Sequence, residues 1–370
     1  MTWRWYALPV APGETGPVAA SKEGPGPIRG GSAKHMRMDY DPTSGRVILT
    51  GGDRAGIGDG NGQPSVWASV DGQKWTTLSP PCISDTAQIY PARPDTVIWA
   101  IDGKRNRGVI MPGFYFGVAK AQSDCHGASL LHTALLFNLT TNRWEAVPWP
   151  APHPNGQYGG DENSSWGIID PVGDSLYRYF WNGNWGATLE KLDLAANTWT
   201  IRQLGEKTAS QAYDDAIRNA YATRAQPALD IRGRSLYFST LDNRLFRVRL
   251  DVPDHRGEWV GKAAPAACVP PGDASQEVYL VFDEAHRAIL RMCTPNAAGE
   301  VLGVAAYFID QAQWAWYAAP TDQPHAVLAN AFTYSPRCRR VIAIGGHLIR
   351  SATTGQMLPN PLVSWTLSLQ

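Results

Sequence analysis

The chain has 370 residues with 33 basic and 33 acidic side chains, so its formal net charge is zero. This balance argues against a broad electrostatic contact with nucleic acid or with an anionic membrane surface. Only 18% of the residues are charged, whereas 36 are Gly, 28 Pro and 15 Trp, which is too apolar for a disordered chain and too often interrupted for a helical bundle. No stretch approaches the ~20 apolar residues of a membrane span. The first residues lack the basic start and the apolar run of a signal peptide.

The sequence repeats a pair of apolar strands that a short turn connects. The first copy spans residues 36–49, where apolar side chains flank a turn at Asp41-Pro42. An apolar run on each side of a turn that carries Asp, Gly or Pro predicts a β-hairpin. Later copies turn at Asp102-Gly103, Asp170-Pro171, residues 230–233, residues 283–286 and residues 335–337.

A second hairpin alternates with the first and ends near a tryptophan. The clearest copies lie at residues 66–75, 135–144 and 189–199, and weaker ones end at Trp259 and Trp314. One hairpin of each kind makes a four-stranded antiparallel unit of roughly 50–60 residues, which is the length of one blade in a kelch-like propeller. Because these tryptophans recur with the repeat, we expect them to pack between blades.

The two kinds of hairpin are unequal in number, which predicts how the fold closes. Six first hairpins stand against five complete second ones, because the chain finishes with a single strand at residues 363–369. Residues 3–9 (WRWYALP) closely match residues 314–320 (WAWYAAP), so the N-terminal segment can supply the missing strand and remove two exposed sheet edges. We therefore predict an all-β, single-domain, six-bladed β-propeller of four-stranded antiparallel blades, with the N-terminal strand pairing in the last blade. The blades are expected at about residues 33–80, 95–150, 164–205, 226–264, 275–320 and 325–370 plus 1–10, with a helical insertion at about 206–225.

The repeat resembles that of kelch-type propellers. Gly51-Gly52 and Gly345-Gly346 match the paired glycines that follow the second strand in that family, and the later tryptophan matches as well. Two of the six blades carry the double glycine, so the resemblance covers the architecture of the whole chain without identifying a subfamily. Residues 69–75 (SVDGQKW) also resemble the Asp-box turn of sialidase-like propellers. That box occurs once, and the arginine triad of a sialidase cannot be located, so we interpret it as a turn motif.

One face of the predicted propeller carries the long loops. These loops span about residues 51–64, 112–131 and 345–361, and loops of such length in a compact fold usually serve a function. Histidine, tyrosine and carboxylate side chains converge on this face, and such groups can exchange protons near neutral pH. The candidates for general acid–base catalysis are His35, Tyr158, Glu162 and His325.

The same face holds candidates for ligand binding. Trp181 and Trp185 fall outside the tryptophan repeat and flank Gly and Asn residues, and an aromatic face beside amides suits a sugar ring. The other candidates are Asp53, Arg54, His132 and His347. By analogy with kelch-like propellers, we expect a binding protein that presents this face to a glycan or a protein partner. The alternative is a carbohydrate-active enzyme, a lyase, mutarotase or glycoside hydrolase, that uses the acid–base candidates at the channel mouth.

No motif implies a cofactor or a bound metal. The sequence has no phosphate-cradling loop, and the cluster of Cys125, His126 and His132 lacks the CxxC or HExxH spacing of a zinc site. His286 belongs to an inner turn on the face opposite the long loops, so it is left out of the candidate site.

Four of the five cysteines form two candidate disulfides. Cys82 lies just before the second blade and Cys125 in its long loop, and Cys268 and Cys293 occupy the equivalent places around the fifth blade. Cys338 is then left single in a turn. Two bridges would indicate an oxidising, extracytoplasmic compartment. The alternative is four unrelated buried thiols.

Overall fold

The computed structural model describes residues 2–7, 37–50, 66–79, 98–111, 133–148, 166–182, 186–196, 198–203, 226–239, 244–252, 257–261, 263–265, 267–268, 280–293, 303–318, 329–345, 349–350, 357–358 and 363–369. Within these ranges the fold is all-β, as predicted, and the single short 3₁₀ turn is η2 (Gly103–Arg105). No helix in them is long and apolar enough to cross a membrane. The expected helical insertion at 206–225 lies outside the described residues.

Most strands belong to six four-stranded antiparallel sheets, of which the first five are each built from two hairpins. Sheet 1 contains β2 (Arg37–Asp41), β3 (Arg46–Thr50), β4 (Val66–Ser69) and β5 (Thr76–Ser79). Sheet 2 contains β6 (Ile98–Asp102), β7 (Arg107–Met111), β8 (Thr133–Asn138) and β9 (Arg143–Pro148). Sheet 3 contains β10 (Trp166–Asp170), β11 (Ser175–Asn182), β12 (Gly186–Asp193) and β13 (Thr198–Gln203).

The later sheets follow the same order until the last. Sheet 4 contains β14 (Ala228–Asp230), β15 (Ser235–Ser239), β16 (Leu245–Arg249) and β17 (Gly257–Val260). Sheet 5 contains β18 (Leu280–Asp283), β19 (Ala288–Cys293), β20 (Gly303–Phe308) and β21 (Gln313–Ala318). Sheet 6 contains β22 (Ala329–Ser335), β23 (Arg340–Gly345), β26 (Val363–Ser368) and β1 (Thr2–Ala7). A separate two-stranded ladder joins β24 (Ile349–Arg350) to β25 (Met357–Leu358).

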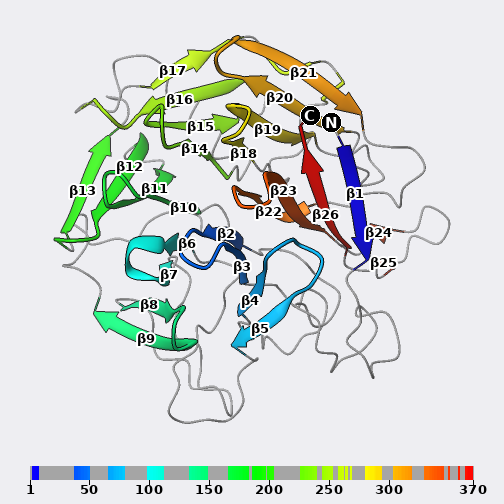
Figure 1. Cartoon of the computed structure of the whole chain (residues 1–370). Helices are drawn as coiled ribbons and strands as arrows, with labels where there is room; N and C mark the ends of the chain where they lie inside the picture. The colour runs from blue at the N-terminus through cyan, green and yellow to red at the C-terminus, as the bar shows by residue number, and fades with distance from the viewer. Residues whose placement is uncertain are drawn as a thin grey trace.

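The N-terminal strand pairs with the C-terminal one. β1 runs antiparallel to β26, with Trp3 opposite Leu367 and Trp5 opposite Trp365. Figure 1 shows the two chain ends close together at the edge of this sheet. The predicted pairing of the N-terminal segment in the last sheet is therefore present for residues 3–7, and residues 8 and 9 lie outside the described residues.

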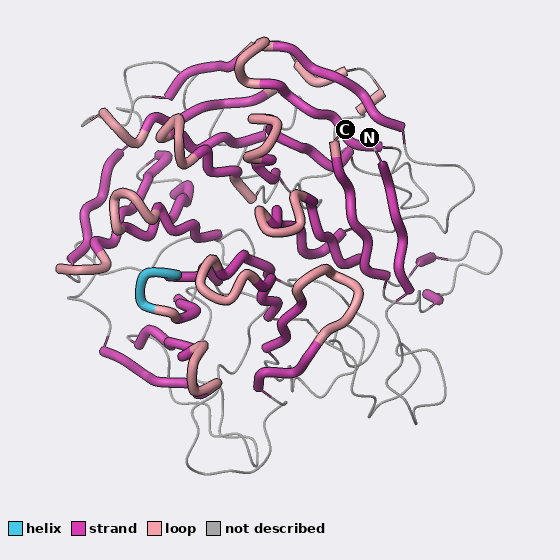
Figure 2. The backbone as a smooth tube through the Cα atoms, viewed as in Figure 1, coloured by secondary structure: helices cyan, strands magenta, loops and turns pink. Residues whose placement is uncertain are grey.

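The six sheets surround a common centre. The first strand of each sheet lies innermost and the fourth lies outermost, with β1 taking the outermost place in sheet 6 (Figures 1 and 2). From sheet 2 to sheet 6, successive sheets share buried apolar clusters; Tyr177 of sheet 3, for example, packs in one cluster with Leu236 and Phe246 of sheet 4. Because such side chains leave water almost completely, each contributes roughly 1.5–3 kcal/mol to stability.

The first hairpin of every sheet turns directly after a buried side chain that caps the turn. In sheet 3, the Asp170 carboxylate accepts the backbone N–H groups of Val172 (3.1 Å) and Gly173 (3.0 Å). A carboxylate that bonds the backbone two or three residues further on stabilises a tight turn. We name this the capping position; from sheet 1 to sheet 6 it holds Asp41, Asp102, Asp170, Asp230, Asp283 and Ser335, all at most 2% exposed.

Four residues after the capping position, the backbone is left-handed in every sheet. The φ values lie between 47° and 68° for Gly45, Asn106, Asp174, Arg234, Arg287 and Arg339. Three of these residues reach back to the preceding sheet. Arg234 makes a two-pronged ion pair with Asp170, and Arg287 binds Asp230 with its Nη2 3.2 Å from Oδ2. Asp174 instead accepts two hydrogen bonds from Arg105 of sheet 2, from Nη1 to its Oδ1 at 2.7 Å and from Nη2 to its Oδ2 at 2.8 Å.

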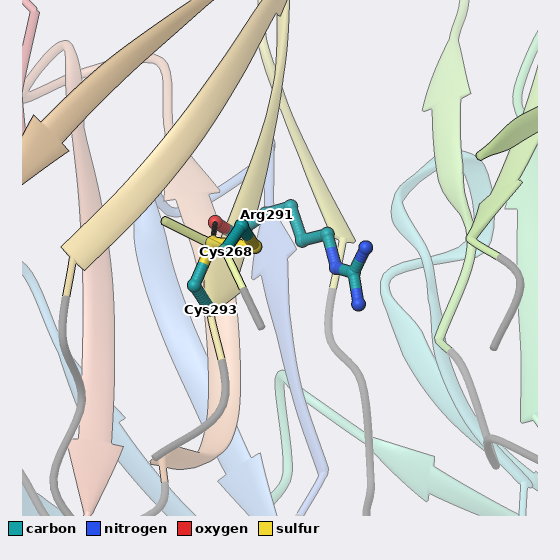
Figure 3. Close-up of a disulfide and its surroundings, with 3 residues drawn as sticks. All are labelled: Cys268, Arg291 and Cys293. Atoms are coloured by element: carbon teal, nitrogen blue, oxygen red, sulfur yellow. Dashed lines mark hydrogen bonds between the residues drawn. A yellow bond between two sulfur atoms is a disulfide. The ribbon is translucent and has the colours of Figure 1, made fainter. Parts of the chain in front are cut away.

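One of the two predicted disulfides is present. Cys268 is bonded to Cys293 at the end of β19, with the two Cα atoms 5.0 Å apart. Figure 3 shows Arg291 beside the bond; its carbonyl oxygen lies 3.8 Å from the Cys293 sulfur, and its side chain extends away from both sulfur atoms. Cys338 is a free thiol. Cys82 and Cys125 lie outside the described residues.

Candidate functional site

A cavity of about 570 Å³ lies at the centre of the sheets, at the end where the first hairpins turn. Two rings of side chains line it, and every sheet contributes one residue to each. The inner ring, one residue before the capping position, holds Tyr40, Ile101, Ile169, Leu229, Phe282 and Tyr334. The mouth ring, one residue after it, holds Pro42, Gly103, Pro171, Ile231, Glu284 and Pro336. The cavity wall is thus mainly apolar, and its opening lies between the turns.

One carboxylate interrupts this apolar wall. Asp39 lies two residues before the capping position of sheet 1, and its side chain lines the cavity. In sheets 2 to 6 the same position, which we name the deep position, holds Ala100, Ile168, Ala228, Val281 and Thr333. Asp39 is therefore the single ionisable residue at this depth among the six sheets.

The Asp39 carboxylate is held by backbone hydrogen bonds. Its Oδ1 accepts the N–H of Tyr40 and its Oδ2 accepts the N–H of Ile101, each at 2.8 Å. Ile101 belongs to β6, the innermost strand of sheet 2, so its N–H points away from its own sheet and toward the centre. Asp39 thus satisfies an edge-strand donor of the neighbouring sheet, which would otherwise be an unpaired buried polar group.

Burial raises the pKa of the Asp39 carboxyl from 3.8 to about 6. The two backbone hydrogen bonds lower that pKa, and the charge of Asp41 raises it, but the loss of hydration is the largest effect. Across the ranges that the structure covers, no Lys, Arg or His side chain forms an ion pair with Asp39. The carboxylate therefore faces the cavity without a counter-charge from those residues.

A second polar group lies in the turn of sheet 5, beside the mouth residue Glu284. The Asp283 carboxylate is 2.9 Å from Nδ1 of His286, and its charge acts on Tyr334 in the inner ring. Burial, and then the charge of Asp283, raise the pKa of Tyr334 above its usual value. His286 does lie in an inner turn, as predicted. The sequence predicts the functional site at the opposite end of the sheets, so His286 is not among the predicted site residues.

The charged residues of the mouth are partly paired with each other. Lys104 is 63% exposed and binds Asp174 with its Nζ 3.0 Å from Oδ2. Arg232 and Glu284 are exposed in their turns. The lining as a whole carries more acid than base, with Asp39, Asp102, Asp174 and Glu284 against Lys104 and Arg232.

The residues predicted from the sequence fall almost entirely outside the described part of the chain. This holds for His35, Tyr158, Glu162, His325, Asp53, Arg54, His132, Trp185 and His347. Trp181 lies in β11, where its backbone pairs with Ala187 of β12. The structure therefore leaves the predicted long-loop site as a prediction and adds a cavity at the opposite end, whose residues the sequence analysis did not select.

The Asp-box segment forms a local turn between β4 and β5. The Ser69 hydroxyl accepts the N–H of Gly72 at 2.9 Å, and Asp71 accepts the N–H of Gln73 at 2.8 Å. The indole N–H of Trp75 donates to the Gly72 carbonyl at 3.1 Å. These bonds all close the turn itself, in agreement with its interpretation as a turn motif.

No protein-family model and no curated protein matches the sequence. Solved structures do resemble the fold. A structural genomics protein of unknown function from Bacteroides thetaiotaomicron is 13% identical, with a TM-score of 0.50 over 98% of this chain and 76% of the other. The K499G mutant of NanB sialidase from Streptococcus pneumoniae is 12% identical, with a TM-score of 0.54 over 90% of this chain and 68% of the other. At these identities the likeness shows a propeller-like fold and nothing about activity.

Proposed function

We propose that the six sheets are the blades of one six-bladed β-propeller of kelch type, closed by β1. Contacts between successive sheets support this arrangement, and so do contacts of the last innermost strand, β22, with the first, β2. At the turn end, Nη1 of Arg337 in sheet 6 lies 3.5 Å from the Ser44 carbonyl oxygen in sheet 1. The blade length and the repeated tryptophan support the kelch assignment.

We propose that this propeller is a binding protein with a small-molecule site in its central cavity. The supporting observation is the cavity itself, because protein interiors are normally close-packed. At about 570 Å³ it lies within the roughly 300–1,000 Å³ typical of ligand pockets. It also has their usual character, an apolar wall with a few polar groups inside. On the opposite face, the long loops are proposed to meet a glycan or a protein partner, with the sequence-based candidates as contacts.

The cavity proposal is tested by a thermal-shift screen of small molecules against three proteins. A ligand that binds only the folded state raises the melting temperature. Leu229→Trp places a bulky indole group among the inner-ring residues, where it fills part of the cavity. Val70→Trp adds the same indole group at an exposed position in the β4–β5 turn. We expect hits on the native protein to persist in V70W and to vanish in L229W. Equal shifts in both variants would show that the hits bind elsewhere and would remove the proposal.

A milder variant guards against a folding defect in L229W. Ala228→Ile puts at the deep position of sheet 4 the side chain that sheet 3 already carries there as Ile168. Ala228 also packs in the buried cluster between sheets 4 and 5, so we expect A228I to cost about 1–3 kcal/mol of stability but to fold, and to weaken cavity ligands without abolishing them. Ligands indifferent to both variants do not occupy the cavity.

One observation favours an enzyme as the second candidate function. A carboxyl with a pKa of about 6 is half protonated near that pH, so Asp39 could serve as a general acid or base. A carbohydrate-active enzyme of the lyase, mutarotase or hydrolase class would then turn over the sugars that the screen finds. If the sugars that bind in the screen remain chemically unchanged after prolonged incubation with the protein, the enzyme proposal is excluded and the binding function stands.

A further inference from the structure

We propose that the ligand of the central cavity is a small organic cation, with its ammonium group against the Asp39 carboxylate and its apolar body against the inner ring. This inference rests on the proposed cavity site and names the chemical class of its ligand. Three features carry it: the uncompensated carboxylate, the apolar and aromatic wall, and the lack of further metal-binding groups.

The first feature is the position of the charge. Taking a carboxylate out of water is costly unless a positive group or several donors compensate it. Asp39 has two backbone N–H partners, and within the described chain no cationic side chain reaches it. The basic residue Lys104 of the lining is engaged by Asp174, and Arg232 lies in an exposed turn beyond the inner ring. Among the described residues this carboxylate has no cationic partner, and a positive group that enters from solvent would supply one.

The second feature is the wall around the carboxylate. Tyr40, Phe282 and Tyr334 bring three aromatic side chains to the inner ring, and the remaining three members are Ile101, Ile169 and Leu229. Aromatic faces attract cations through the ring quadrupole, most strongly where water is excluded. The aliphatic residues favour the hydrocarbon part of an amine. An anionic ligand that reached the inner ring would meet the Asp39 carboxylate and would be repelled.

The third feature separates an organic cation from a metal ion. Magnesium and calcium require several oxygen ligands, and here the deep position offers one carboxylate, since its counterparts are Ala100, Ile168, Ala228, Val281 and Thr333. No group of three or more metal-ligating side chains occurs in the part of the chain that the structure describes. A single carboxylate at the deep position, beside the apolar inner ring, matches the recognition of one ammonium group.

The test uses two pairs of probes that differ in charge but little in shape. Choline is compared with 3,3-dimethylbutan-1-ol, and 2-phenylethylamine with 2-phenylethanol, by titration calorimetry of the whole protein at pH 8, where Asp39 is ionised. We expect at least one cation to bind ten-fold or more tightly than its neutral partner. Asp39→Asn should remove that difference, and Asp251→Asn, the same change at an exposed residue outside the cavity, should preserve it. Equal binding of cation and neutral probe, or an undiminished difference in D39N, would overturn the inference.

A measurement on the native protein covers the case in which D39N folds poorly. Near pH 6 about half of the Asp39 carboxyls carry a proton, and a cation that binds the ionised form displaces it. Choline cannot titrate, so its binding should release up to about half a proton at pH 6, read from the heats in two buffers of different ionisation enthalpy. No proton release on choline binding would contradict the inference.

The outcomes also separate this inference from the proposed function. Neutral compounds that bind the native protein and V70W but not L229W, while neither amine binds, would leave a cavity site and eliminate the organic cation. If no compound of any charge distinguishes L229W from V70W, both ideas fail together. Amines that prefer the native protein and lose their preference in D39N support both.

Discussion

Arg234 and Asp174 occupy the same left-handed position in the turns of neighbouring sheets and carry opposite charges. Arg234 reaches back to the capping carboxylate Asp170. Asp174 instead receives Arg105, which also binds the capping carboxylate Asp102 with its Nη1 3.1 Å from Oδ2. Both junctions therefore place one guanidinium next to a buried capping carboxylate, although the arginine comes from the following sheet in one case and from the same sheet in the other.

Removing the arginine from the first junction should destabilise the fold. Arg234→Ala leaves Asp170 buried with only its backbone partners, and an uncompensated buried carboxylate costs about 3 kcal/mol. Arg249→Ala breaks an exposed ion pair with Asp251 and should change the stability much less, because water screens this pair. Urea unfolding measures both values. Identical midpoints for the two variants would contradict the assigned role of Arg234.

Asp39 should make the fold less stable as pH rises. Its folded-state pKa of about 6 lies above 3.8, so the folded protein binds the proton more tightly than the unfolded chain. The resulting stabilisation is complete below about pH 3.8 and is lost as pH rises through about 6; it amounts to about 3 kcal/mol. Between pH 4 and pH 7, the free energy of unfolding of the native protein should therefore fall by most of this amount relative to that of Asp39→Asn. Urea titrations of both proteins at the two pH values measure the difference.

Other charges near Asp39 remain in both proteins and cancel in that comparison. Arg105 holds the pKa of Asp174 well below its usual range, so this carboxylate contributes stability that is lost as pH falls, the opposite sign to Asp39. The remaining charged groups around Asp39 and the cavity are Arg37, which lines a small pocket together with Asp39, and Asp41, Asp102, Lys104, Arg232 and Glu284. Parallel pH curves for the native protein and D39N would refute the raised pKa.

The disulfide should stabilise the fold by limiting the unfolded chain. Cys268 and Cys293 are 25 residues apart, and a loop of that size corresponds to about 3 kcal/mol in the chain-entropy model. Cys268→Ala with Cys293→Ala should lower the melting temperature, and a reductant should then have no further effect. Cys338→Ala should melt like the native protein, because Cys338 is a free thiol.

Gly108 should not tolerate a side chain. A Cβ atom there would lie 2.0 Å from the ring of Trp99, which is itself 3% exposed and has no free space to move into. Gly108→Ala should therefore cost about 1–3 kcal/mol through overpacking. Combining it with Trp99→Leu should recover part of this loss, and a double-mutant cycle in urea measures the coupling. Additive effects would show that the two positions do not contact each other.

Hairpins and their turns could be predicted from the sequence because the signals are local. Asp170-Pro171 and its counterparts mark the turns, and the match of residues 3–9 to residues 314–320 predicts the pairing of β1 with β26. The bridge between Cys268 and Cys293 followed from their places around the same repeat. In each case the information lies within one repeat or in a comparison of two.

The cavity could not be predicted in the same way. Its size depends on how far side chains from six strands, remote in sequence, fill the centre. One signal was nonetheless present: alignment of the repeats on the capping position leaves Asp39 as the single charged residue at the deep position. This signal is weak in the sequence alone, because Asp39 lies only two residues before the turn residue Asp41. An aspartate at that place is readily interpreted as part of the turn.

The pairing of β1 with β26 separates the order of synthesis from the order of assembly. Residues 2–7 are synthesised before the five complete sheets, yet the strand with which they pair, residues 363–368, is synthesised after all of them. Translation adds about 5–20 residues per second, so β1 waits roughly 20–70 seconds for its partner while five sheets form. Until β26 is made, β1 has no partner in its sheet, and its exposed edge is one to which a second nascent chain could bind.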